Sequence, residues 1–353
     1  MNTFKYINGS LHCEGVDLSL LEEKHGTPSY VYSKKTIEEN AKAYVNSFTN
    51  TRNLACFAVK SLSNLSILKI IKDAGCGFDI VSGGELHRVL SIGAEPKKII
   101  FSGVGKTKNE IQQGINSSIL SFNVESESEL YRIEKIADDI ESPAPISIRI
   151  NPDIDSGGHD YITTGRKGDK FGISDIRKVI DLCKYAHQSK NLKIVGLACH
   201  IGSQILDLDG FMKSADKIFE LADELVNFDI SLEFLDLGGG LGISYENEVP
   251  PSPLDLISCL EDKFKNRKER LILEPGRSIS ANAGVLLTKV EYIKDNFLIV
   301  DAAMNDLLRP SLYKAHHDVC NVEDKKDNLK KWTVVGPVCE SSDFLAKNAS
   351  LDV

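Results

Sequence analysis

The chain has 353 residues, 42% of them hydrophobic and 26% charged, and a formal net charge of −9 at pH 7. This composition is typical of a soluble globular protein that is large enough for about two domains. The negative charge, without any block rich in Lys and Arg, argues against nucleic acid or an anionic membrane as the main partner.

The N-terminal sequence MNTFKYINGS lacks the basic and apolar regions of a signal peptide, and no apolar run reaches the length of a transmembrane helix. The eight cysteines are scattered, without CxxC pairs or metal-ligand spacing. We therefore expect a cytoplasmic protein with reduced thiols and no metal site.

From Ser33 to Arg277 the sequence alternates amphipathic helical stretches with short apolar runs. Helices are expected at 34–48, 64–74, 83–92, 107–114, 126–138, 173–188, 208–227 and 252–266. Strands are expected at 54–59, 78–81, 98–102, 118–122, 145–150, 193–200, 232–237 and 270–273. This α/β alternation predicts a parallel (β/α)₈ barrel of the TIM type, which we assign to residues 33–280.

Beyond Ala283 the pattern changes to segments rich in β-branched residues, with little helical periodicity: GVLLTKVEYIK, NFLIVDAA and KWTVVGPV. PSYVYS, residues 28–33, is also strand-like. We expect a second, mostly β domain built from residues 1–32 and 281–353. No clear strand is expected after Phe344-Leu345, so this domain is predicted to be incomplete at its C-terminus.

Polar residues follow many of the predicted strands, at the end of a parallel barrel where catalytic groups lie. Lys60 closes the apolar run LACFAVK, and burial there is expected to lower its pKa toward the reactive amine that a Schiff-base lysine requires. An ordinary solvated lysine is the competing interpretation. The other polar or glycine residues at predicted strand ends are Asp79, Ser102, Arg149, His200, Gly238–Gly240 and Glu274–Arg277.

Two glycine-containing loops, LDLGGGLG (235–242) and EPGRS (274–278), follow the seventh and eighth predicted strands. Each is compatible with a tight turn or with a backbone cradle for phosphate. Phosphate sites of such barrels often lie in these two loops, which favours the cradle.

The segment CHIGSQ and Glu274 offer contacts to an aromatic cofactor. His200 is either a packed histidine or a ring that lies against a cofactor, with Ser203 as a phosphate donor. Glu274 either forms a salt bridge to Arg277 or Arg149, or lies beside a pyridine nitrogen. In the second case it would keep that nitrogen protonated and make the ring an electron sink.

Eight segments together resemble the diaminopimelate decarboxylase family, fold-type III enzymes that depend on pyridoxal 5′-phosphate (PLP): FAVKSLSNLSIL, GFDIVSGGEL, FSGVGKT, CHIGSQI, DLGGGLG, EPGRSISANAG, MNDLLRPSLY and GPVCESSDFLAK. They occur in family order from about residue 28 onward, and EPGRS, RPSLY and PVCES are specific to this branch. The resemblance implies a carboxy-lyase that converts meso-2,6-diaminopimelate to L-lysine and CO₂, the last step of lysine biosynthesis.

The resemblance also implies residue roles. Lys60 carries PLP through a Schiff base, His200 stacks on the ring and Glu274 pairs with the ring nitrogen. Cys339 is the proton donor, supplied by the neighbouring subunit of a homodimer. The implied cofactor-binding residues are Lys60, Asp79, Arg149, His200, Ser203, Gly239, Gly240, Glu274, Pro275, Gly276 and Arg277. The implied substrate-binding residues are Arg277, Arg309, Tyr313 and Glu340.

The chain departs from the family pattern at its C-terminal side. Relatives usually continue for some tens of residues past Val353, with a tyrosine segment that reaches the cofactor, and Ser342 replaces a common glycine. We therefore expect PLP binding with weak or no turnover. Two alternatives remain. The chain could be a catalytically silent binding partner, or it could be a related decarboxylase of basic amino acids or polyamine precursors.

Overall fold

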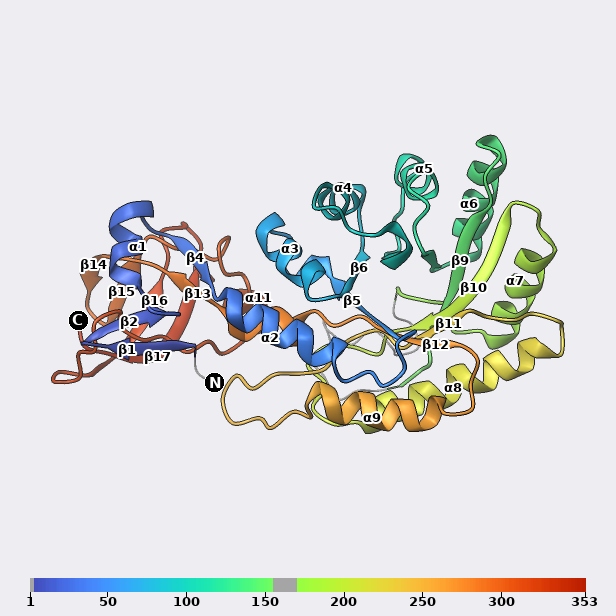
Figure 1. Cartoon of the computed structure of the whole chain (residues 1–353). Helices are drawn as coiled ribbons and strands as arrows, with labels where there is room; N and C mark the ends of the chain where they lie inside the picture. Colours follow the sequence, from blue (N-terminus) through green and yellow to red (C-terminus); the bar gives the residue numbers. More distant parts are fainter. Residues whose placement is uncertain (1–2, 155–169) are drawn as a thin grey trace. The chain divides into compact units, whose positions relative to one another are not determined.

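The computed structural model describes residues 3–154 and 170–353 of the chain (Figure 1). These residues form two compact units. The larger comprises Ile37–Ile243 and Val249–Ala281, and the smaller comprises Met1–Thr36, Ser244–Glu248 and Asn282–Val353.

The larger unit is a closed parallel barrel, which confirms the predicted fold class. Its strands are β5 (Leu54–Ala58), β6 (Gly77–Ile80), β7 (Ile99–Phe101), β8 (Ser121–Val124), β9 (Ala144–Ile150), β10 (Leu192–Cys199), β11 (Phe234–Asp236) and β12 (Arg270–Leu273). Each strand pairs with the next along the chain, and Ile272 of β12 pairs with Leu54 of β5 to close the barrel. Every strand therefore ends at the same mouth, as the site prediction requires.

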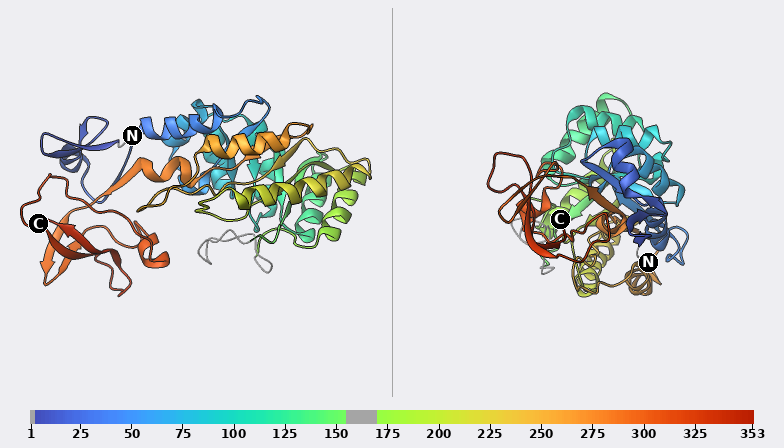
Figure 2. Two further views of the ribbon diagram at one scale, coloured as in Figure 1. Left: turned by 90° about the horizontal axis from the view of Figure 1, so that it is seen from below. Right: turned by 90° about the vertical axis from the view of Figure 1, so that its left-hand side faces the viewer.

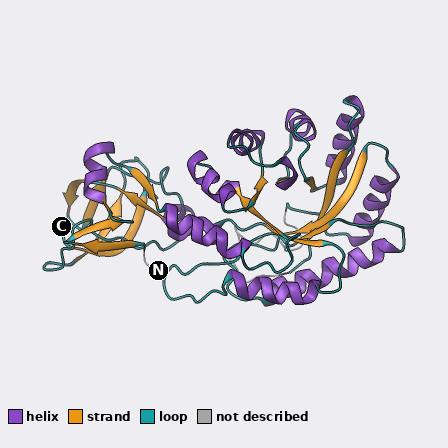
Figure 3. Ribbon diagram, viewed as in Figure 1, coloured by secondary structure: helices purple, strands orange, loops and turns teal. Residues whose placement is uncertain are grey.

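Helices precede, connect and follow the barrel strands and lie outside them (Figure 3). They are α2 (Lys34–Val45), α3 (Leu65–Asp73), α4 (Gly83–Ser91), α5 (Lys108–Asn116), α6 (Glu127–Asp139), α7 (Ile176–Gln188), α8 (Asp209–Val226), α9 (Pro253–Phe264) and α10 (Arg277–Ser280). Short 3₁₀ turns occur at Val59–Ser61, Pro96–Lys98 and Ala281–Ala283.

Local signals fix where several of these helices begin. Thr107 and Ser252 form capping boxes with Glu110 and Asp255, and the Asp175 side chain caps α7. Helices α8 and α9 run side by side (Figure 2). Between them, Phe219 and Phe264 meet edge to face with ring centroids 4.9 Å apart. Within residues 3–154 and 170–353, every helix is too short or too polar to span a bilayer.

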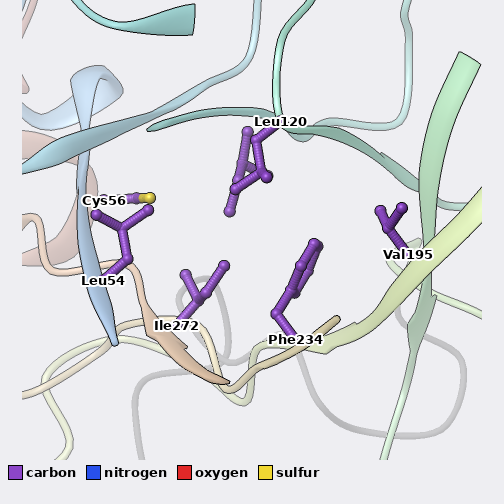
Figure 4. Close-up of a cluster of buried hydrophobic side chains, with 7 residues drawn as sticks. Leu54, Cys56, Leu120, Val195, Phe234 and Ile272 are labelled. Carbon is purple, nitrogen blue, oxygen red and sulfur yellow. The ribbon is translucent and has the colours of Figure 1, made fainter. Parts of the chain in front are cut away.

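The interior of the barrel has an apolar layer below a polar one. The apolar layer contains Leu54, Cys56, Ile100, Leu120, Val195, Phe234 and Ile272. The side chains labelled in Figure 4 point toward one another. Strand side chains alternate between faces, so residues two positions further along share the inward direction. Ser102, Asp236 and Glu274 are those residues after Ile100, Phe234 and Ile272, and all three are buried. The alternation thus places these polar groups nearer the C-terminal ends of the strands than the apolar layer.

The smaller unit is mostly β structure, as predicted. Its strands are β1 (Phe4–Ile7), β2 (Ser10–Cys13), β3 (Val16–Asp17), β4 (Ser29–Tyr32), β13 (Gly284–Leu287), β14 (Val290–Lys294), β15 (Phe297–Val300), β16 (Lys330–Val335) and β17 (Phe344–Leu351), with helices α1 (Leu18–His25) and α11 (Arg309–Tyr313). The antiparallel pair β4–β13 joins the two ends of the sequence, and Leu11 packs with Leu287 in a shared apolar cluster.

The expectation that no clear strand follows Phe344-Leu345 is wrong. Strand β17 continues to Leu351 and pairs antiparallel with β16, and the Trp332 indole donates to the Leu351 carbonyl at 3.2 Å. The segment FLAKNASL has few β-branched residues, so its sequence gave a weak strand signal. Burial of Leu345 and Leu351 against Trp332 and Val334 supplies the stabilisation that local propensity lacks.

Candidate active site

Lys60 lies in the 3₁₀ turn that directly follows β5. Its ammonium donates a hydrogen bond of 2.8 Å to Oδ2 of Asp79, a wholly buried residue of β6, while the Lys60 side chain is 52% exposed. Burial lowers the pKa of Lys60, but the Asp79 and Glu274 carboxylates together raise it by more, so the net pKa lies above its ordinary value of 10.5. The expected lowering of the Lys60 pKa is therefore wrong, because two acidic neighbours outweigh desolvation.

Glu274 is buried in the polar layer, where Asn123 donates to its Oε1 at 3.4 Å and to Ser102 Oγ at 3.1 Å. Ser147 in turn donates to the Asn123 side-chain oxygen. Burial, followed by the charges of Asp236 and Asp79, raises the pKa of Glu274 well above its ordinary range. Glu274 therefore binds a proton more tightly than an exposed glutamate does.

Arg149 pairs with a carboxylate that the sequence analysis missed. Its guanidinium lies 2.6 Å from Oε1 of Glu125, and Glu125 Oε2 accepts the Gly172 N–H at 2.8 Å. Glu129 accepts the Glu125 backbone N–H at 2.7 Å and forms a buried ion pair of 2.8 Å with Lys106. This network fixes Arg149 at the end of β9.

The Lys106 side chain is only 1% exposed, and it also donates to the Gly103 and Asn123 carbonyls, each at 2.8 Å. Three acceptors satisfy all three N–H donors of its ammonium. The segment FSGVGKT, which contains Lys106, was noted in the sequence as part of the family resemblance. It does not indicate that Lys106 pairs with Glu129.

His200 follows β10, and its Nδ1 accepts the Gly239 N–H at 3.2 Å. A nitrogen that accepts carries no proton, so the neutral ring has its proton on Nε2. Burial lowers the pKa of His200 well below its ordinary value, and the positive charges of Arg149 and Lys60 lower it further. The ring is thus neutral at physiological pH.

The loops after β10, β11 and β12 meet backbone against backbone. A Cβ on Gly239 would lie 1.9 Å from the Glu274 carbonyl oxygen, and one on Gly240 would lie 2.2 Å from that of Gly202. Gly240 also has a φ of +114°, a conformation that L-residues rarely adopt. Glycine is therefore required at both positions.

The loop after β12 brings further groups of the expected cofactor set together. The Pro275 carbonyl accepts the Ala58 N–H at 2.9 Å, which ties this loop to the end of β5 beside Lys60. A Cβ on Gly276 would lie 3.2 Å from that of Ala58. Arg277 donates through Nε and a terminal nitrogen to Ser203 Oγ, at 3.2 and 3.0 Å. A guanidinium, a hydroxyl and glycine backbone thus lie at one place, as an anion site requires.

The remaining expected site residues belong to the smaller unit. The Arg309 guanidinium lies over the Tyr245 ring, 4.6 Å from its centroid, and 2.9 Å from His317 Nε2. Tyr313 ends the same helix, α11. Cys339 and Glu340 are exposed before β17. The roles of Arg309, Tyr313, Cys339 and Glu340 stay predictions.

A cavity of about 600 Å³ lies beside α11 in the smaller unit. Its lining includes Ser311, Lys314, His317 and Lys347. The acidic Asp318 lines the cavity as well, whereas Arg309 does not.

The barrel residues fit PLP by their own chemistry. Lys60 supplies an amine, Arg277 and Ser203 supply donors for a phosphate, and His200 supplies a flat neutral ring. Nothing in the described part of the chain donates a hydrogen bond to the buried Oδ1 of Asp79 or Oδ2 of Asp236. Buried polar atoms without partners are rare and mark places where a ligand or a proton belongs.

Comparisons with known proteins agree with this geometry. Residues 34–281 match the family described as pyridoxal-dependent decarboxylase, pyridoxal binding domain. The chain is 46% identical to diaminopimelate decarboxylase of Haemophilus influenzae, with 100% of the chain and 86% of that protein covered. It is 45% identical to the Pseudomonas aeruginosa enzyme of the same name, with 99% of the chain and 85% of that protein covered.

The fold comparison gives the same result. The crystal structure of diaminopimelate decarboxylase from Helicobacter pylori complexed with L-lysine matches with a TM-score of 0.91 and 42% sequence identity. The match covers 96% of this chain and 85% of that one. Sequence and structure, over nearly the whole chain, thus lead to one conclusion: the chain belongs to the diaminopimelate decarboxylase family.

Proposed function

We propose that this chain is a PLP-dependent carboxy-lyase that converts meso-2,6-diaminopimelate to L-lysine and CO₂, the last step of lysine biosynthesis. The observation that carries the proposal is the barrel mouth, where Lys60, His200, Glu274 and the Ser203–Arg277 pair lie at the ends of strands of one barrel. Relatives at 45–46% identity that carry this enzyme name support the substrate.

Bound PLP supplies an electron-withdrawing ring that accepts the electron pair left when CO₂ departs. Lys60 would hold PLP through its amine, and Asp79 fixes that lysine. Arg277, Ser203 and the backbone of Gly239, Gly240 and Gly276 would bind the phosphate, with Pro275 and Arg149 beside them. His200 would lie against the ring, and Glu274 would hold a proton at the ring nitrogen.

The overall reaction replaces a carboxylate with a proton. Cys339, supplied by the second subunit of a homodimer, delivers that proton to the carbon that loses CO₂. Arg277, Arg309 and Tyr313 bind the substrate at its distal end, where Arg309 receives the carboxylate and Glu340 the ammonium. The cation–π and hydrogen-bond contacts of Arg309 with Tyr245 and His317 support a fixed carboxylate receptor.

The residues that bind the distal end of the substrate, Arg309 and Glu340, account for the choice of substrate. Lysine and ornithine lack a distal carboxylate, so either would leave Arg309 without its partner. Sites built around a polar group reject analogues that lack it by about 10⁴-fold or more. This favours diaminopimelate over the basic amino acid substrates of related decarboxylases. We also place the reaction in the cytoplasm, because all eight cysteines are free and lie in the described residues.

The proposal is tested by release of CO₂ and lysine from meso-diaminopimelate with added PLP. Lys60→Ala is expected to lose on the order of 10³-fold or more in kcat. Lys69→Ala, which removes an exposed lysine paired with Asp73 at 3.2 Å, is the matched control and should retain full activity. Lysine and ornithine serve as competing substrates. PLP absorbance that depends on Lys60, without any turnover, would instead support a silent binding partner.

A further inference from the structure

Asp236 is a buried acid for which the proposed reaction has no role. It ends β11, is 0% exposed, and its Oδ1 accepts the Gly238 N–H at 2.9 Å. Its Oδ2 has no hydrogen-bond donor in the described residues. The carboxyl of Glu274, on the neighbouring loop after β12, is its side-chain hydrogen-bonding neighbour.

Two adjacent buried carboxyl groups need a proton between them. An ionised carboxylate only accepts hydrogen bonds, so two ionised groups in contact cannot hydrogen-bond to each other and repel. The Asn123 amide donates to Glu274 Oε1 at 3.4 Å and is also a hydrogen-bonding neighbour of Asp236, but it supplies no proton that either carboxyl could hold. One protonated carboxyl resolves the arrangement, because its O–H donates to the other group.

The charges around the pair oppose one another: Asp79 raises the pKa of Glu274, whereas Lys60 lowers it. Arg149 is a further cation near Lys60, and the buried thiols of Cys56 and Cys199 also lie close to the two acids. Burial, the largest cause, raises the pKa of Asp236 to about 6. Burial and the Asp236 charge raise the pKa of Glu274 well above its ordinary range.

We propose that Asp236 and Glu274 share one proton and that Asp236 is the positioning residue that keeps this proton on Glu274. This inference rests on the proposed function, in which Glu274 lies beside the ring nitrogen of PLP. With PLP bound, the Glu274 carboxyl would give this proton to the ring nitrogen, and the positive charge of the ring would offset the two carboxylates.

Infrared spectroscopy of the full chain tests the proposal, because a protonated carboxyl has a C=O stretch distinct from that of a carboxylate. Spectra are recorded against pH, without and with PLP, on protein labelled with ¹³C at Glu carboxyls. Without PLP we expect a protonated Glu band that persists to neutral pH. Addition of PLP should remove this band, since the proton moves to the ring. Absence of the band at neutral pH without PLP would overturn the proposal.

Two substitutions assign the band. Asp236→Asn keeps an acceptor for the Gly238 N–H but removes the charge next to Glu274. The pH at which the protonated Glu274 band is half lost should therefore fall by at least about one unit, as expected for coupled sites. This pH is called the Glu midpoint. Glu274→Gln should abolish the persistent Glu band. Asp175→Asn, at the exposed N-cap of α7, is the matched control and should leave the spectrum unchanged, because Asn caps equally well.

The outcomes separate this proposal from the proposed function. An unchanged Glu midpoint in folded Asp236→Asn, with the fold checked by circular dichroism, would refute the role of Asp236. If Asp236→Asn does not fold, Glu274→Gln with ¹³C-Asp labelling gives the reciprocal test, in which the Asp236 midpoint should fall. Failure of wild-type decarboxylation would count against the function alone, because the infrared titration uses no substrate.

Discussion

Lys60 illustrates how far a single residue can be understood from its sequence context. Its place after an apolar strand marked it as a candidate, and the structure puts it at the barrel mouth. The direction of its pKa shift depends on Asp79 and Glu274, which reach it from β6 and from the loop after β12. Neither neighbour is close to Lys60 in sequence. The chemistry of the residue was therefore predictable, whereas its electrostatic environment was not.

Substitution of the single residue Arg277 is predicted to weaken PLP binding. Arg277→Met removes the guanidinium that donates to Ser203 and, in our proposal, to the phosphate. A hydrogen bond to a charged group contributes about 1.5–3 kcal/mol, so PLP affinity should fall by about 10- to 100-fold. Absorbance titration with PLP measures this change. Arg52→Met, which removes an exposed arginine bonded to the Lys268 carbonyl, is the control; equal losses in both variants would exclude a specific phosphate contact.

Asp236 predicts a pH dependence of stability. Its pKa rises from 3.8 to about 6 on folding, mainly by burial, so between these values the folded state binds more protons than the unfolded state. Stability is then lost as pH rises through this window and stays reduced above it. Asp236→Asn should raise the free energy of unfolding at pH 8 by on the order of 2 kcal/mol and change it little near pH 4. Urea unfolding at both values checks this, and a gain of equal size at each pH would contradict it.

At the scale of elements, the helical and apolar patterns predicted the barrel well. The observed strand boundaries differ from the predicted ones where a turn interrupts an apolar run. A strand was expected at 118–122, whereas β8 is Ser121–Val124. Ser118 has a φ of +55° and ends the preceding turn, which pushes the strand forward. Asn123 has low strand propensity, yet it lies in β8 because Ser102, Ser147 and Glu274 satisfy its amide.

The buried pair Lys106–Glu129 gives a prediction for the loops that hold Arg149. Lys106→Met leaves Glu129 buried without its cation, which should cost about 3–5 kcal/mol of unfolding free energy. The double variant Lys106→Met/Glu129→Met removes both charges and should recover much of that loss. Urea denaturation of both proteins and the wild type measures the difference. A double variant that is no more stable than the single one would show that the ion pair is not the cause.

At the scale of the whole molecule, the proposed reaction requires two subunits. If Lys60 and Cys339 from different subunits complete each site, Lys60→Ala and Cys339→Ala should each be inactive alone. Equal mixing and reassembly would form heterodimers with one intact site and restore about a quarter of wild-type activity. The measurement is lysine release after mixing, with each variant incubated alone as the control. No recovery, with heterodimers shown to form, would place both residues in the same subunit.

The sequence by itself determined the barrel, the mostly β smaller unit and the chemistry-bearing residues at strand ends, because hydrophobic periodicity and short motifs are local properties. Only the tertiary structure decided which of these groups meet. It joined Asp79 to Lys60, Asp236 to Glu274 and Lys106 to Glu129, placed Ser244–Glu248 in the smaller unit, and formed β17 despite its weak propensity. These contacts join residues from different strands and loops, and their burial and charge depend on packing that no local pattern contains.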